Sequence, residues 1–117
     1  MPMRSLLAAL MLGASTLGAL AAASSVPFDY TPDPALRTAS RAELESRVRR
    51  ACTVTQGRLT GQAEASLARP CGCYASRTLR AFTPVELDAY RTTGVFDDGG
   101  RSKALAAIDS CGLRRPA

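Results

Sequence analysis

The sequence contains no histidine and no tryptophan, and its three methionines all lie within the first 11 positions. Without histidine the chain cannot build a Ser-His-Asp or Cys-His nucleophile system. It also cannot supply histidine ligands to zinc, copper or haem. No glycine-rich phosphate-binding loop of the expected pattern is present. We therefore expect a protein that is not an enzyme and that uses no cofactor and no metal.

Residues 1–23 have the organisation of a secretory signal peptide. Arg4 gives the positive start, residues 6–20 form an apolar run, and positions 21–23 are the small residues that a signal peptidase needs. The apolar run is shorter than the ~20 residues of a membrane-spanning helix. We expect cleavage after position 23 or 21, a periplasmic or secreted product, and no transmembrane span in the mature chain.

The charge of the chain is positive and is carried almost entirely by arginine. There are 15 basic and 10 acidic residues, and Lys103 is the single lysine. This excess favours an anionic partner, although solvated surface charge alone also accounts for it. Aromatic residues make up only 5% of the chain, so the stacking platform of a nucleic-acid-binding protein is missing. We expect an unknown protein or an anionic component of the cell envelope as partner, and no nucleic acid.

Residues 24–39 form a proline-containing leader, which favours an extended segment over a helix. The sequence leaves open whether this leader is loose or lies across the domain with two aromatic anchors. The prolines are Pro27, Pro32 and Pro34, and the anchors are Phe28 and Tyr30.

A capping box formed by Ser40 and Glu43 predicts the first helix. Gly57 is its expected end. The apolar face is expected to carry Leu44, Val48, Ala51 and Thr55, with Cys52 at its edge.

Residues 58–70 are ambiguous, because residues 62–68 favour a short helix and Pro70 either ends it or begins the next one. The following helix is predicted over residues 71–81. Its apolar face is expected to carry Ala75, Thr78, Leu79 and Phe82, with Tyr74 beside it.

A second capping box, Thr83 with Glu86, predicts a third helix that begins with proline and ends near Gly94. This helix has apolar residues on two sides, which is typical of a helix packed between two neighbours. One side carries Val85, Ala89 and Thr92, and the other carries Leu87 and Tyr90.

Residues 95–101 contain two aspartates and two glycines, but their spacing does not match a calcium-binding loop. We expect a loop without a ligand there, and a last helix capped by Ser102 and closed by Gly112. The apolar stripe of this helix is Ala104, Ala107, Ile108 and Cys111.

The sequence therefore predicts an all-α fold, since no segment alternates strictly and β-branched residues are few. We expect a small bundle of about four short helices over residues 40–113, cross-linked by two disulfides. An extended N-terminal segment precedes this domain, and a basic tail, residues 114–117, follows it.

The four cysteines, Cys52, Cys71, Cys73 and Cys111, are an even number in a small exported chain, which is typical of a disulfide framework. If a helix begins at Cys71, Cys71 and Cys73 point about 200° apart. One sulfur then faces the first helix, and the other faces the last helix. Two pairings remain open: Cys52–Cys71 with Cys73–Cys111, which we favour slightly, and Cys52–Cys73 with Cys71–Cys111.

Two other uses of these cysteines have a physical basis. Cys71 and Cys73 could form a strained redox-active pair, because Arg69 and a helix N-terminus lower the pKa of a thiol. Four cysteines also match the ligand number of zinc, but the spacing and the expected compartment do not fit. Structural disulfides remain the favoured interpretation.

Two groups of residues are candidates for binding a partner. The first is a set of arginines, and the second is an apolar groove near three aromatic residues. The arginines are Arg41, Arg47, Arg50, Arg77 and Arg80, and the aromatic residues are Tyr74, Tyr90 and Phe96.

The order Cys52, Cys-Gly-Cys at 71–73, Thr-Pro-Val-Glu-Leu at 83–87 and Cys111 resembles small exported four-cysteine helical proteins of Proteobacteria. This resemblance covers residues 44–112. Residues 38–52 are more weakly similar to the UrcA family, whose single cysteine pair leaves Cys73 and Cys111 unmatched. Neither resemblance implies an activity.

Taken together, these observations favour a non-catalytic periplasmic or secreted module that binds a partner or supports an envelope assembly. Three alternatives remain open: a thiol–disulfide redox protein that uses Cys71 and Cys73, a stress-related holdase, and an immunity protein against a secreted toxin.

Overall fold

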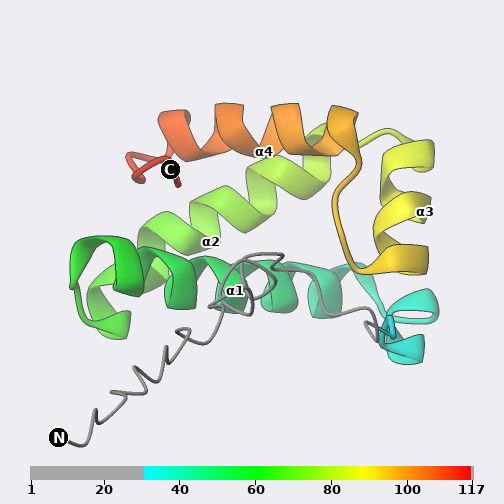
Figure 1. Ribbon diagram of the computed structural model, residues 1–117, viewed down its shortest axis with the longest axis horizontal. Helices are drawn as coiled ribbons and strands as arrows, with labels where there is room; N and C mark the ends of the chain where they lie inside the picture. Colours follow the sequence, from blue (N-terminus) through cyan, green and yellow to red (C-terminus); the bar gives the residue numbers. More distant parts are fainter. Residues whose placement is uncertain (1–30, 117) are drawn as a thin grey trace, which may run out of the picture. The chain divides into compact units, whose positions relative to one another are not determined.

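The computed structural model describes residues 31–116, which form a helical domain (Figure 1). The all-α prediction is confirmed, and the described residues contain no strand. Residues 1–23 and the proposed anchors Phe28 and Tyr30 lie outside the described part. A 3₁₀ turn, η2 (Pro34–Arg37), precedes α1 (Arg41–Thr60), α2 (Glu64–Ala81), α3 (Pro84–Thr93) and α4 (Asp98–Ser110).

The central element of the domain is α2, which packs against α1 on one side and against α4 on the other (Figure 1). The short helix α3 lies at one end of this arrangement, in contact with η2 and α4. Within residues 31–116, every helix is too short or too polar to cross a membrane.

The first helix begins at the predicted capping box. The Glu43 amide donates to Ser40 Oγ at 3.2 Å, and the Ser40 amide donates to the Glu43 carboxylate at 2.9 Å. The predicted end at Gly57 is wrong, because α1 continues to Gly61, whose φ of +72° gives the left-handed cap. Gly57 instead lies inside α1, where a Cβ would be 3.9 Å from the Leu67 side chain, so α2 can begin close beside it.

The second helix starts earlier than the sequence indicates. Residues 64–81 form one continuous helix, and Pro70 lies in its interior rather than at a boundary. Proline removes one backbone N–H and leaves the carbonyl four residues earlier without its helical donor. The helix persists because Leu67, before the proline, is 1% exposed and Cys71, after it, is bonded to α1.

The third helix has the predicted boundaries, with reciprocal Thr83–Glu86 capping and a left-handed Gly94 at its end. It is not packed on both sides, however. Val85 is 75% exposed, whereas Glu86 and Tyr90 are the buried residues of α3. The predicted side with Leu87 and Tyr90 therefore faces the core, whereas Val85 on the other predicted side faces solvent.

The fourth helix begins at Asp98, so the prediction of a loop up to Ser102 is wrong. Asp97 is the N-cap, and its carboxylate accepts the Gly100 amide at 2.8 Å. Gly100 lies under the Phe82 ring, where a Cβ would be only 3.0 Å from a ring carbon. Glycine thus allows α4 to start against an aromatic side chain. As predicted, Gly112 closes the helix, with a φ of +70°.

The described end of the leader is part of the domain. Residues 34–37 form a 3₁₀ turn rather than an extended strand, because Asp33 caps the turn by accepting the Ala35 amide at 2.9 Å. Leu36 is 3% exposed, and Arg91 donates to the carbonyl oxygens of Leu36 and Ala39 at 3.2 and 2.6 Å.

Two disulfides complete the core. Cys52 is bonded to Cys71 and Cys73 to Cys111, so the favoured pairing is confirmed.

The buried stripe of α1 follows steps of four residues, and it leaves the predicted core residues Ala51 and Thr55 exposed. The stripe is Leu44, Val48, Cys52 and Gln56.

Candidate functional site

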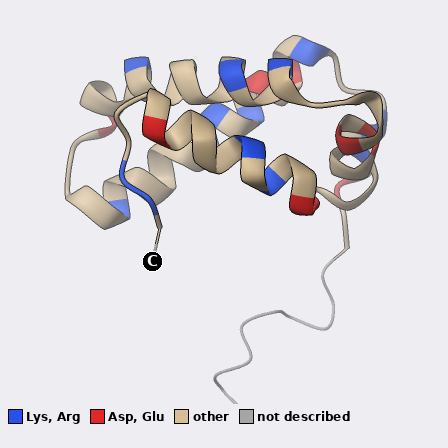
Figure 2. Cartoon of the chain, turned by 90° about the horizontal axis from the view of Figure 1, so that it is seen from above, with Lys and Arg blue, Asp and Glu red and all other residues tan. Residues whose placement is uncertain are grey.

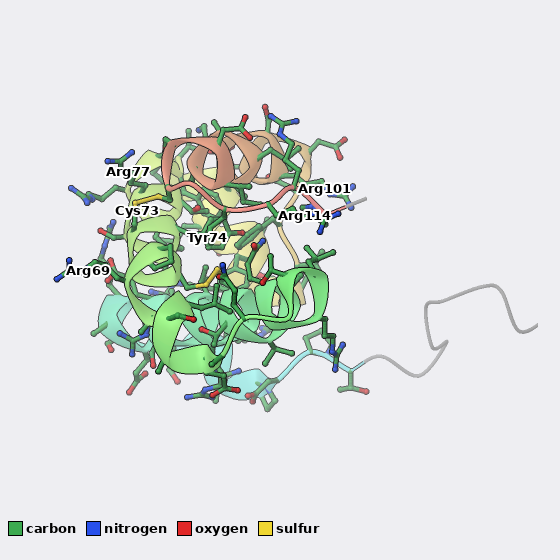
Figure 3. The ribbon with its side chains drawn as sticks, turned by 90° about the vertical axis from the view of Figure 1, so that its left-hand side faces the viewer. Arg69, Cys73, Tyr74, Arg77, Arg101 and Arg114 are labelled. Atoms are coloured by element: carbon green, nitrogen blue, oxygen red, sulfur yellow. A yellow bond between two sulfur atoms is a disulfide. The ribbon has the colours of Figure 1, made fainter. Side chains whose placement is uncertain are left out.

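An apolar cavity of about 280 Å³ lies between α1 and α4. Its walls come from all four α-helices, from the loop before α4 and from the C-terminal tail. Figure 3 shows the Tyr74 side chain projecting from α2 into the space between these helices. The lining residues are Val48, Ala51, Cys52, Thr55, Gln56, Tyr74, Tyr90, Gly94, Phe96, Ile108 and Pro116.

The three aromatic residues that the sequence singles out all line this cavity. Phe96 packs against Tyr90 with a centroid separation of 5.1 Å, and against Phe82 in an edge-to-face contact at 5.0 Å. Such contacts orient aromatic rings. One wall of the cavity is therefore a pre-arranged aromatic surface.

The cavity is electrically neutral. Among residues 31–116, no charged side chain belongs to its lining. Burial raises the pKa of the Tyr74 hydroxyl, and the nearby Tyr90 adds to this effect. Tyr74 therefore remains un-ionised near neutral pH, and the site offers neither a cation nor an anion to a ligand.

Gln56 is the most polar residue of the lining, and its amide is already in use. Its Nε2 donates to the Arg114 carbonyl at 2.7 Å, and its Oε1 accepts the Arg114 amide at 3.1 Å. Arg114 also donates to the Leu59 carbonyl at 2.9 Å. These bonds hold the tail so that Pro116 reaches the cavity, and they fix the position of the Gln56 amide with one hydrogen bond at its nitrogen and one at its oxygen.

Exposure indicates where the cavity opens. Ala51, Thr55 and Pro116 are exposed, whereas Val48 and Ile108 are buried. The mouth therefore lies between the solvent side of α1 and the tail, and the buried residues form the inner wall.

The predicted arginines do not form one site. Arg41 pairs with Glu45 at 3.8 Å, and Arg47 pairs with Asp33. The Arg47 guanidinium, together with the Ala35 amide, lowers the pKa of Asp33, the amide having the larger effect. Arg50 is exposed on α1.

Arg77 and Arg80 project from α2 and bond to neutral oxygens. Arg77 donates to the Ser110 carbonyl at 3.5 Å, and Arg80 donates to the Ser76 hydroxyl at 2.7 Å. Neither belongs to the lining of the cavity that contains Tyr74 and Tyr90. The structure thus separates the predicted binding residues into an aromatic interior and a basic exterior.

The cysteines are all engaged in disulfides, and the described residues contain no free thiol. An oxidised Cys-Gly-Cys redox centre would have Cys71 bonded to Cys73. Here each of the two is bonded to a different cysteine. Within residues 31–116, the aspartate, glutamate and cysteine side chains do not gather in any group of three or more that could hold a metal ion.

Sequence reasoning missed the α1 and tail contributions to the cavity, above all Gln56 and Pro116. A signal for Gln56 was present, because it continues the four-residue steps of the apolar stripe of α1. No comparable signal exists for Pro116, whose position depends on hydrogen bonds formed across the fold.

Comparisons of the chain with models of protein families, with curated proteins and with solved structures find no match. An assignment of function therefore depends on the residues and geometry of the domain itself.

Proposed function

We propose that this chain is an exported, non-catalytic helical domain, stabilised by two disulfides, that binds an apolar group in the cavity between α1 and α4. The observation that carries this proposal is the neutral lining around Tyr74 and Tyr90. Concave, mostly apolar sites with few polar groups are the usual form of small-molecule binding sites.

The volume of the cavity limits the size of the bound group. A cavity of roughly 150 Å³ lined by apolar side chains holds benzene, and typical ligand pockets begin near 300 Å³. At about 280 Å³, the site suits two fused rings or one short alkyl chain. The absence of charge in the lining favours a neutral group.

Two features support export. Residues 1–23 have the pattern of a signal peptide, and all four cysteines are paired in disulfides. Disulfides of this structural kind persist in oxidising compartments. Expression of the full chain in a Gram-negative host tests this part. We expect a periplasmic product with the mass of residues 24–117 or 22–117, less four hydrogens; a full-length product in the cytoplasm would contradict export.

Binding is tested with the neutral fluorescent dye 2-naphthol, which has two fused rings, and with two alanine-to-tryptophan variants of α1. Ala51 lines the mouth of the cavity, whereas Ala42 is exposed on α1 outside the lining. We expect Ala51→Trp to block the mouth and lower dye affinity at least tenfold, and Ala42→Trp to leave it unchanged. Equal affinity in both variants would place the dye elsewhere and overturn the proposal.

A further inference from the structure

A separate feature of the molecule is a basic surface on the side of α2 that faces away from the cavity. We call Arg49, Arg69, Arg77 and Arg80 the arginine face; all four side chains are exposed. Figure 3 shows Arg69, Cys73 and Arg77 on one side of α2, while Tyr74 points into the domain.

Helical geometry explains why these residues share a surface. Arg69 and Arg80 are 11 positions apart and therefore lie within about 20° of each other around the helix, roughly 16 Å apart along it. The buried residues Cys71 and Thr78 lie on the opposite side. From α1, Arg49 extends the surface, since its side chain lies 4.0 Å from the position of a Cβ on Gly72.

The arginine face has almost no compensating negative charge. Residues 46–85 contain seven arginines and one acidic residue, Glu64, which shares a shallow depression with Arg49 and Arg50. Figure 2 shows basic positions along the body of α2, whereas acidic positions occur on α3 and at both ends of α4.

The ion pairs of the domain do not neutralise this surface. Within residues 31–116, the four ion pairs use Arg41, Arg47, Lys103 and Arg115, none of which belongs to the arginine face. The carbonyl and hydroxyl bonded by Arg77 and Arg80 are uncharged. Four guanidinium groups are therefore available to an anionic surface.

We propose that the arginine face docks on the anionic headgroups of a lipid membrane. One guanidinium group can donate two parallel hydrogen bonds to the oxygens of a phosphate, and it retains its charge at any physiological pH. Each basic residue near an anionic bilayer adds to the attraction within about one Debye length. A face that spans about 16 Å can contact several headgroups at once.

The composition of the face favours lipid over a protein or a nucleic acid. Protein interfaces depend on buried aromatic anchors, and single-stranded nucleic acids stack on exposed aromatic rings. In the described chain, Tyr74, Tyr90 and Phe96 are turned into the cavity. The large exposed apolar residues are Val54, Val85 and Val95, none of them on α2.

Sedimentation with vesicles tests the proposal, using the oxidised full-length chain. Vesicles of phosphatidylglycerol and phosphatidylcholine in equal amounts are compared with pure phosphatidylcholine. Residues 1–23, which include Arg4, are common to the unaltered chain and its variants, so their contribution cancels when the variants are compared. We expect preferential binding to the anionic vesicles and loss of that preference at about 0.5 M salt, where the Debye length falls below roughly 5 Å.

Two double variants with the same net charge distinguish binding through the arginine face from attraction by the overall positive charge of the chain. Arg69→Gln with Arg80→Gln is expected to weaken the anionic preference roughly 25-fold, at about fivefold per arginine. Arg58→Gln with Arg101→Gln, which changes exposed arginines outside the face, is expected to leave it nearly unchanged. Far-ultraviolet circular dichroism verifies that all variants are folded.

Three results would overturn the proposal: no anionic preference in the unaltered chain, equal losses in both double variants, or tighter binding to a single-stranded oligonucleotide than to the vesicles. The proposal is independent of the cavity, because Ala51→Trp is expected to leave vesicle binding unchanged.

Discussion

Cys71 and Cys73 are separated by one glycine, yet they tie α2 to two different neighbours. Cys71 is bonded to Cys52 of α1, and Cys73 is bonded to Cys111, the residue after α4. Residues two positions apart in a helix point about 200° apart, so the two sulfurs leave α2 on different sides. This geometry makes Cys-Gly-Cys a junction that fixes the helices around the cavity.

The two disulfides differ in burial, and we predict that they open in order. Cys52 and Cys71 are 7% and 0% exposed, whereas Cys73 and Cys111 are partly exposed. Under mild reduction, we expect the Cys73–Cys111 bond to open first, because thiol–disulfide exchange needs access to a sulfur. Alkylation followed by peptide mapping gives the order. Earlier labelling of Cys52 and Cys71 would contradict the burial of the Cys52–Cys71 bond.

The Cys73–Cys111 bond is also expected to stabilise the domain. It closes a sequence separation of 38 residues, for which loop entropy gives about 4 kcal/mol before any strain. Replacing both cysteines with alanine is predicted to lower the free energy of unfolding by about 3–4 kcal/mol. Urea unfolding at fixed pH measures this loss, and a change below about 1 kcal/mol would show that the bond does not constrain the unfolded chain as supposed.

Thr78 has a fully buried hydroxyl that lacks a hydrogen-bond partner within the described residues. An unsatisfied buried hydroxyl costs about 1–3 kcal/mol, and valine has nearly the same shape. We predict that Thr78→Val raises the free energy of unfolding by about 1 kcal/mol.

A matched control for this substitution is Thr93→Val. The Thr93 hydroxyl donates to the Ala89 carbonyl at 2.8 Å and accepts the Val95 amide at 3.1 Å. We expect this variant to lose about 1 kcal/mol. Denaturant unfolding measures the free energy of unfolding of both variants. If Thr78→Val lowers it as much as Thr93→Val, the Thr78 hydroxyl has a hydrogen-bond partner in solution.

Pro70 interrupts the hydrogen bonding of α2 without ending the helix. In a helix interior, proline is about 3 kcal/mol less favourable than alanine, although it also restricts the unfolded chain by up to ~1 kcal/mol. Pro70→Ala is therefore predicted to stabilise the domain by about 2 kcal/mol. Thermal and urea unfolding give the measurement.

The matched control is Pro84→Ala, at the first position of α3. Proline is pre-organised for the helix at that position and loses no hydrogen bond, so we expect no gain in stability. Equal effects at positions 70 and 84 would indicate that the interior of α2 is already relaxed around its proline.

Glu86 connects the cap of α3 to α4 and makes stability depend on pH. Its carboxylate bonds to Lys103 and accepts the Thr83 amide at 2.8 Å, and these contacts, Lys103 first, lower its pKa. Because the folded state then binds the proton less readily than the unfolded state, the stabilisation is complete above the ordinary glutamate pKa of about 4.3. It is lost as pH falls through the lower folded pKa.

We predict that Glu86→Gln lowers stability at pH 7 and flattens the decline in stability as the pH falls below the ordinary glutamate pKa of about 4.3. Asp88→Asn, an exposed change on the same helix, serves as the control. Urea unfolding across this pH range gives both slopes. A slope for Glu86→Gln as steep as that of the unaltered chain would assign the acid sensitivity to other carboxylates.

The sequence predicts those helix ends that depend on local chemistry. Ser40 with Glu43 and Thr83 with Glu86 are capping boxes, and Gly94 and Gly112 adopt the left-handed conformation that ends a helix. Each of these signals acts within a few residues of the chain. The angular separation of positions two residues apart also indicated that Cys71 and Cys73 bond to different helices, but it left two pairings open, of which the structure has the one slightly favoured.

The boundaries that the sequence misplaces depend on contacts made across the fold. Pro70 lies within a helix because Leu67 and Cys71 on either side of it are buried against other elements. Asp97, rather than Ser102, caps α4, since Gly100 packs under Phe82. Propensity alone cannot weigh such contacts.

The sequence predicted the aromatic part of the candidate site but not the part formed by the C-terminal tail. Tyr74, Tyr90 and Phe96 were grouped correctly, and they come from α2, α3 and the loop before α4. The tail could not be included, because its place depends on the bonds between Gln56 and Arg114.

The most direct test of the central claim is a nuclear magnetic resonance titration of the oxidised protein with 1-octanol, a neutral single-chain probe. The chain has three tyrosines and three phenylalanines, so the ring resonances of Tyr74, Tyr90 and Phe96 can be assigned individually. The account predicts that these three rings shift together and saturate, while Phe82, outside the cavity lining, shifts less. Unchanged Tyr74 and Tyr90 resonances at saturating octanol would contradict the claim that the cavity is a binding site.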